Sequence, residues 1–177
     1  PACERSVAWI LWGVFVAALV TFFQVNIIHD AFQYYGYLVS AGLHGDLNLY
    51  EEIYIHNAYR FYNPFPLHSG RYIGTAIMQA PFFAVGHLAA LVMNHFGSSY
   101  ALNGYSLPYL FFTSLASGFA GLAGLCVCYF LCREFFSRQT SLIALLGVWL
   151  ASPLVFFMFT WNGWSHPFAF LFVSLFL

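Results

Sequence analysis

Three long stretches of this sequence, residues 6–29, 72–132 and 139–177, contain no charged side chain. Only 6% of the 177 residues are charged, against roughly 25% in a soluble domain. Because a charge is costly in hydrocarbon and about 20 helical residues cross a bilayer, the pattern predicts an all-α, polytopic integral membrane protein. It argues against an ordinary cytosolic domain or a disordered chain, and the net charge of −1 argues against nucleic-acid binding.

The uncharged stretches divide into four or five hydrophobic helices that form one transmembrane unit over residues 1–177. We expect a first span at 6–28, a loop with amphipathic helices at 29–71, a spanning or interfacial helix at 72–93, and spans at 105–132 and 140–159. Residues 167–177 begin a further span of only 11 residues, so we expect the natural chain to continue. The 6–28 run is longer than the core of a signal peptide, which favours a retained span.

Segment 72–93 decides the topology. If it lies in the interface, Arg5, Arg133 and Arg138 all fall on the cytoplasmic side, as the positive-inside rule prefers. We therefore predict a cytoplasmic N-terminus, a helix at 72–93 that is interfacial and broken near Pro81, and an extracytoplasmic segment from residue 29 to about 104. The turn at 160–166 then reaches the same side. The alternative is an ordinary span, with His87 facing a protein neighbour.

Asp30 is the candidate catalytic base. It opens a stretch in which Phe32, Tyr35, Leu38 and Val39 recur at helical spacing, and Gly42 is a candidate stop. A carboxylate where the first span leaves the membrane can take a proton from a substrate hydroxyl. The competing interpretation is structural, because Asp is a favoured helix N-cap.

The other polar residues of the loop give weaker signals. Arg60 and Arg71 suit phosphate because the guanidinium donates hydrogen bonds in pairs, although each could equally be an interfacial anchor. Gly45-Asp46 predicts a turn. The histidines lack the spacing of a metal site, so no metal ligand is assigned, but a divalent metal held with Asp30 is left open. Small residues between Ser114 and Gly124 predict close helix packing.

The order of these motifs resembles the N-terminal portion of membrane glycosyltransferases of the GT-C superfamily, the relatives of protein mannosyltransferases. The resemblance covers essentially the whole chain. It rests on an ordered set of short motifs, namely Asp30 with Tyr34-Tyr35-Gly36-Tyr37-Leu38, Gly45-Asp46-Leu47, the segment 72–83, Gly104-Tyr105-Ser106-Leu107-Pro108-Tyr109, Arg133-Glu134-Phe135-Phe136-Ser137, Ala151-Ser152-Pro153-Leu154 and Ser165-His166.

The resemblance implies a bacterial cytoplasmic-membrane enzyme that moves a sugar from a polyprenyl-phosphate carrier to an acceptor at the extracytoplasmic face. It implies Asp30 as the catalytic residue, and the substrate-binding residues would be Tyr34, Tyr35, Arg60, Arg71 and His166. The expected partners are membrane lipid, the polyprenyl-phosphate sugar and other membrane subunits. Relatives often have glycine where this chain has His29. They often carry an acidic residue in the turn before Ser165-His166, which in this chain reads Thr160-Trp161-Asn162-Gly163-Trp164.

A second hypothesis is a non-catalytic membrane subunit of a larger complex. His87 or His166 would then pack against, or ligate, a pigment or haem, because imidazole in an apolar setting is a natural axial ligand. Absorbance of the purified protein separates the two hypotheses. Under the first, we expect residues 1–177 alone to be inactive.

Overall fold

The computed structural model describes residues 2–49, 52 and 71–177, and in these residues it contains helices and no strands. The elements are α1 (Ala2–Phe22), α2 (Asp30–Val39), the π-helical turn η1 (Ser40–His44), α3 (Gly74–His95), α4 (Leu107–Phe135), α5 (Arg138–Leu150), α6 (Leu154–Phe159) and α7 (His166–Phe176). The all-α prediction is therefore confirmed for the described part of the chain.

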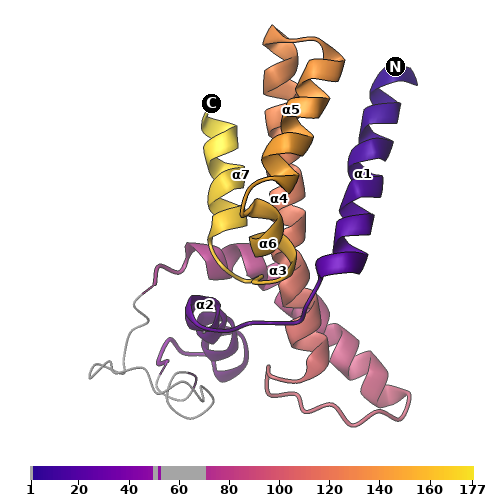
Figure 1. Cartoon of the computed structure of the whole chain (residues 1–177). Coiled ribbons are helices and arrows are strands. Elements are labelled where there is room, and N and C mark those ends of the chain that lie inside the picture. Colours follow the sequence, from indigo (N-terminus) through magenta and orange to yellow (C-terminus); the bar gives the residue numbers. More distant parts are fainter. Residues whose placement is uncertain (1, 50–51, 53–70) are drawn as a thin grey trace.

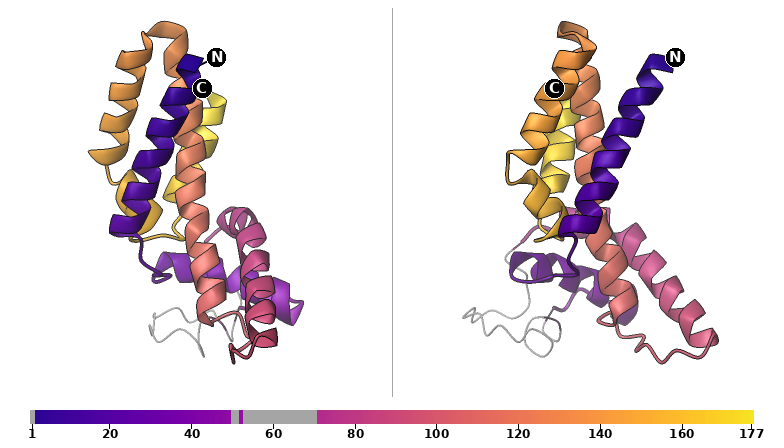
Figure 2. Two further views of the ribbon diagram at one scale, coloured as in Figure 1. Left: turned by 90° about the vertical axis from the view of Figure 1, so that its right-hand side faces the viewer. Right: turned by 45° about the vertical axis from the view of Figure 1, so that its right-hand side comes forward.

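Helix α4 is the central element. Its C-terminal half stands among α1, α5, α6 and α7, while its N-terminal half packs against α3, with α2 lying across the same end of the molecule (Figures 1 and 2). The α4–α5 connection lies at the same end as both chain termini, where the Arg138 guanidinium donates a hydrogen bond to Ser6 Oγ. The loop between α3 and α4 lies at the opposite end.

Small residues let the other helices approach α4 closely. A Cβ atom built on Gly121 would lie 2.5 Å from Met158 Sδ of α6, and one built on Gly124 would lie 2.6 Å from the Phe170 ring of α7. On α3, a Cβ atom at Gly86 would lie 2.8 Å from Tyr109 Cα. Backbones this close leave no room for a side chain, so the packing role predicted for the small residues is confirmed.

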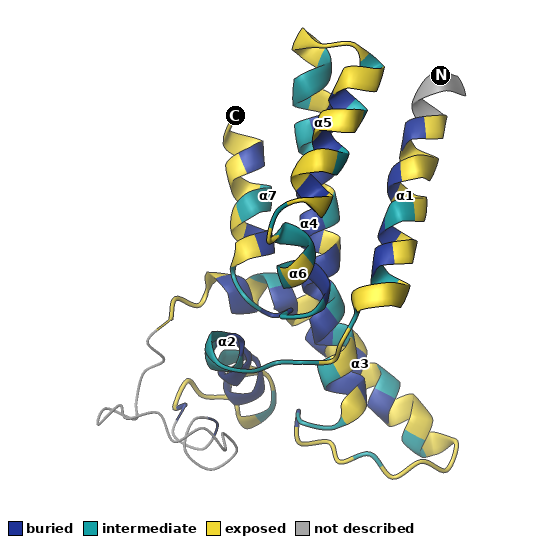
Figure 3. Cartoon of the chain, in the orientation of Figure 1, coloured by how far each residue is buried: buried dark blue, intermediate teal, exposed yellow. Residues whose placement is uncertain are grey.

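Two helices, α3 and α4, are long and apolar enough to cross a membrane, and Ser6–Phe22 and His166–Phe176 are shorter apolar helices. Figure 3 shows exposed residues along the outer faces of α1, α5 and α7. Many of them are large and apolar, including Trp9 (72% exposed) and Val20 (81%). A soluble monomer rarely leaves so much apolar surface to water, which agrees with the membrane class.

Helix boundaries differ from the expected ones in four places. Helix α3 runs unbroken through Pro81, so the predicted break there is wrong. Helix α1 ends at Phe22 instead of 28, and the segment expected as one span at 140–159 is divided into α5 and α6 around 151–153. The helical path from Asp30 continues past Gly42 and ends at Gly45, whose φ of 76° is the left-handed conformation that glycine adopts at a helix C-terminus.

We predict that Gly86→Ala lowers the free energy of unfolding by about 1–3 kcal/mol, because the added methyl overlaps the α4 backbone, which cannot move aside. Gly147→Ala is the matched control. Gly147 lies exposed inside α5 with nothing within 4 Å of its Cβ position, so alanine should raise stability by about 0.5–1 kcal/mol. Thermal or denaturant unfolding in detergent measures both, and equal effects of the two variants would contradict the close α3–α4 contact.

Candidate functional site

The backbone of Gly163 joins α3 and α4 to the turn between α6 and α7. Its N–H donates to Ser117 Oγ of α4 at 2.7 Å, and its carbonyl accepts from Gln79 Nε2 of α3 at 3.0 Å. Ser117 and Gln79 are 0% and 1% exposed. Gly163 has a φ of 83°, and a Cβ there would lie 3.0 Å from the Ala31 side chain, so a larger residue would be strained and would press on α2.

The same turn holds the segment that leaves α1. Asn162 Nδ2 donates to the Gln24 carbonyl, and Thr160 Oγ1 donates to the Phe22 carbonyl at 3.2 Å. The Gln24 N–H in turn donates to the Phe159 carbonyl at 2.9 Å. These bonds satisfy carbonyls left open where α1 ends, and they fix where the chain enters α2.

His29 connects this turn to the candidate acid. Its φ of 53° is a left-handed conformation that favours glycine, and its ring lies 5.8 Å from that of Trp161, centroid to centroid. A non-glycine residue holds such a backbone only where its surroundings impose it. The structure therefore brings residues 29–31 and 160–166, far apart in sequence, to one place.

Asp30 forms an ion pair with Arg71. The Asp30 carboxylate contacts the Arg71 guanidinium, and the two side chains are 24% and 44% exposed. Asp30 is the first residue of α2, after His29 at the N-cap, and α2 has no side-chain capping hydrogen bond. The N-cap interpretation of Asp30 is therefore wrong. Two of the predicted site residues are in direct contact, and Arg60 lies outside the described residues.

Tyr34 and Tyr35, both predicted to bind substrate, are buried in α2 at 7% and 0% exposure. The Tyr35 hydroxyl donates a hydrogen bond to the Gly104 carbonyl, and its ring packs against Phe83 and Tyr105. Burial raises the pKa of Tyr35 well above its usual value. Tyr35 is therefore a core residue, and its hydrogen bond to Gly104 links α2 to the loop before α4.

His166, the remaining predicted site residue, is exposed at the start of α7. Its ring lies 4.2 Å from that of Phe157 and stacks on Trp164, which stacks on Trp161. A row of rings thus runs from His166 to Trp161, and from there to His29 beside Asp30.

A groove with a volume of about 540 Å³ lies between α2–η1 and α3. Its lining is almost entirely apolar, with two polar side chains, and consists of Tyr37, Leu38, Ala41, Gly42, Leu43, Ile73, Ala76, Ile77, Ala80, Phe83, Ala84, His87 and Leu88. The Tyr37 hydroxyl donates to the Arg71 carbonyl at 3.2 Å, so the Arg71 backbone lies beside this lining. His87 Nδ1 lies 2.6 Å from Tyr109 Oη.

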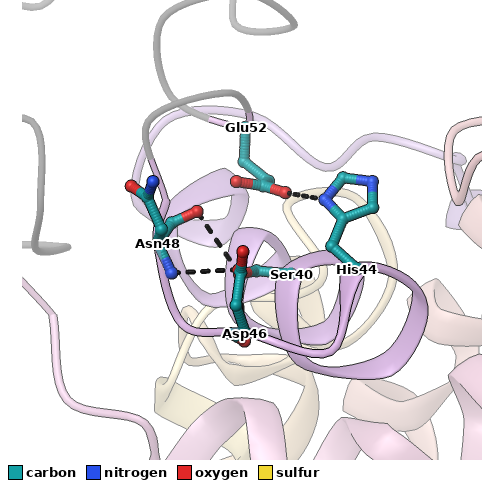
Figure 4. Close-up of polar contacts among 5 residues, drawn as sticks. All are labelled: Ser40, His44, Asp46, Asn48 and Glu52. Carbon is teal, nitrogen blue, oxygen red and sulfur yellow. Dashed lines mark hydrogen bonds and ion pairs between the residues drawn. The ribbon is translucent and has the colours of Figure 1, made fainter.

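The other acidic residues of the described loop are held by local contacts (Figure 4). Asp46 Oδ1 accepts from Ser40 Oγ at 2.7 Å and from the Asn48 N–H at 3.1 Å. The Ser40 bond, followed by the Asn48 bond, lowers the Asp46 pKa. His44 Nδ1 lies 2.9 Å from the carboxylate of the fully buried Glu52, close enough for an ion pair when the imidazole is protonated. Asp46 has the turn role expected for it.

Within residues 2–49, 52 and 71–177, no group of three His, Cys, Asp or Glu residues is placed to hold a metal ion. No protein-family model, curated protein or solved structure matches the chain.

Sequence reasoning missed the part played by Gln79 and Ser117. Gln79 gave one usable signal, because it is an uncharged polar residue in an otherwise apolar helix and such a residue needs a partner when buried. Asn162-Gly163 is a turn dipeptide, but nothing in the sequence shows which helices its peptide groups meet.

We predict that Ser117→Ala lowers the free energy of unfolding by about 1–3 kcal/mol, because it leaves the buried Gly163 N–H without a partner. The control is Ser114→Ala on the same helix. Ser114 is equally buried, but its hydroxyl has no hydrogen-bond partner among the described residues, so its removal should cost almost nothing. Unfolding of both variants in the same detergent is the measurement, and an unchanged Ser117→Ala protein would show that the Gly163 bond adds no stability.

Proposed function

We propose that this chain is part of a GT-C-like membrane glycosyltransferase, which takes a sugar from a polyprenyl-phosphate carrier and passes it to an acceptor hydroxyl. The observation that carries the proposal is the Asp30–Arg71 ion pair beside the apolar groove. A cation for phosphate, a carboxylate for a proton and an apolar groove for a lipid chain are the three groups that this reaction requires.

The groove suits a single hydrocarbon chain. Ala76, Ala80 and Ala84 follow one another at four-residue spacing along α3, and their small side chains leave a channel beside α2 and η1. From Ala76 to Leu88 the lining extends over about 18 Å of helix. Apolar walls with few polar groups are typical of sites that bind apolar ligands. A chain lying here would have its polar end near Arg71.

The chemistry is a single displacement at the anomeric carbon. Asp30 takes the proton of the acceptor hydroxyl as its oxygen attacks that carbon. The bond from the carbon to the phosphate oxygen breaks, and the lipid phosphate leaves with its negative charge. Arg71 stabilises that charge with paired N–H donors.

We further propose that the chain is polytopic in the bacterial cytoplasmic membrane, with its N-terminus in the cytoplasm and α2 and η1 in the outer interface. The arrangement of α4 supports this orientation. Arg133 and Arg138 lie at the end of α4 that also holds the start of α1, and Asp30 lies toward the other end. The exposed apolar residues of α1, α5 and α7 would face lipid or other membrane subunits.

The topology predicts the labelling of single introduced cysteines. In a background without the native cysteines, Ser98→Cys and Asp46→Cys should both react with a membrane-impermeant maleimide in intact cells, and Ser137→Cys should react only after permeabilisation. All three positions are exposed. If positions 46 and 98 label from opposite sides, α3 crosses the membrane and the interfacial assignment is wrong.

We predict that Asp30→Asn lowers sugar transfer by about 10²–10⁴-fold, because the amide keeps the size of the side chain and removes the proton acceptor. The assay follows label from a panel of polyprenyl-phosphate sugars in membranes containing the natural protein. Asp46→Asn is the control, since it changes an exposed acid whose carboxylate contacts Ser40 and Asn48. Near-normal transfer by a folded Asp30→Asn protein, judged by thermal unfolding, would reject Asp30 as the base.

A further inference from the structure

The Arg71 guanidinium has two possible partners in this site. It contacts the Asp30 carboxylate in the structure, and the proposed reaction brings a phosphate to the same place. Both partners are anions that accept hydrogen bonds from the N–H donors along the edge of the planar guanidinium, so they compete for these donors. A carboxylate whose oxygens are engaged by a guanidinium also has fewer lone pairs free for a substrate proton.

We propose that Arg71 exchanges partners: the phosphate of the lipid carrier displaces Asp30 from Arg71, and the released carboxylate becomes available to the acceptor hydroxyl. Arg71 is then a positioning residue as well as a phosphate ligand, since it withholds the base until a donor is bound. This inference rests on the proposed function for its role in catalysis. The exchange itself concerns binding alone.

The energetics allow the exchange. Ion pairs between partly exposed side chains are weak, because water and salt screen them and both side chains lose freedom. With 24% and 44% of the two side chains exposed, the Asp30–Arg71 pair belongs to this class. A phosphate can offer Arg71 paired acceptors and a larger charge, and a lipid tail in the groove adds apolar burial that Asp30 cannot match.

The backbone geometry also allows the exchange. The Tyr37 hydroxyl holds the Arg71 carbonyl, and the chain enters α3 three residues later, at Gly74. The backbone of Arg71 is therefore anchored beside the groove. In the proposed exchange the long side chain turns from Asp30 toward the headgroup while the backbone of Arg71 keeps its place.

The experiment measures the affinity of the purified chain, in nanodiscs of neutral lipid, for farnesyl phosphate, with farnesol as the uncharged probe. Removing the competitor should strengthen binding, so we expect Asp30→Asn to bind farnesyl phosphate about two- to fivefold more tightly. Arg71→Gln should bind it about 10- to 100-fold more weakly. Asp46→Asn should bind like the unmodified chain, and farnesol should bind equally to all variants.

A double-variant comparison separates partner exchange from simple charge repulsion. If Asp30 acts by occupying Arg71, Asp30→Asn should have no effect once Arg71 is already glutamine. If Asp30 only repels the phosphate, Asp30→Asn should tighten binding by the same factor whether position 71 is arginine or glutamine. That result would reject the exchange. Equal or weaker binding by Asp30→Asn alone rejects it as well.

Two further controls keep the outcomes distinct. Asp30→Ala also removes the carboxylate and should give the same tightening, so the result does not depend on one variant folding, which thermal unfolding checks for each. If the unmodified chain binds farnesyl phosphate no more tightly than farnesol, the exchange is rejected. If Asp30→Asn binds farnesyl phosphate more tightly but the natural protein in membranes transfers no sugar from any carrier of the panel, the exchange stands and the proposed function is rejected.

Discussion

The two hydrogen bonds of the Gly163 backbone join three parts of the chain that are distant in sequence. Ser117 lies in the middle of α4, Gln79 in the first half of α3, and Gly163 between α6 and α7. All three are buried, where an unpaired peptide group would cost more than in water. The preceding residue, Asn162, binds the chain leaving α1. Because Ala31 packs on Gly163, this turn positions the start of α2.

Prolines show what the sequence can and cannot predict about such a fold. Pro108 and Pro167 lie in the first turn of α4 and α7, where the missing N–H has no intrahelical partner, and there the sequence rule succeeds. Pro81 lies inside α3, yet the helix continues through it as α3 packs along α4. Pro153 comes where the chain turns between α5 and α6. The break at Pro153 follows the local rule that proline ends a helix, whereas the outcome at Pro81 depends on tertiary contacts, which a local pattern does not contain.

The candidate site was predictable to the extent that charge is rare in this chain. Asp30 and Arg71 stand out because each borders a long uncharged stretch, 6–29 and 72–132, but their contact across 41 residues of sequence is a property of the fold. Tyr35 shows the opposite case. Its helical spacing with Leu38 and Val39 predicted a buried face, and the structure places it there, whereas the resemblance implied a role with substrate. Periodicity reports burial directly, while a resemblance carries a role over from other proteins.

Helix α2 links the two parts of the proposed site, the acid Asp30 and the apolar groove. Asp30 begins the helix, and Tyr37 and Leu38, about 10 Å further along it, line the groove. The buried Tyr35 ring and its bond to Gly104 fix α2 against the loop before α4, so acid and groove cannot shift independently. A chain seated in the groove therefore sets the depth of any headgroup relative to Asp30. Under the proposed function, recognition of the lipid and placement of the reacting carbon would both depend on this ten-residue helix.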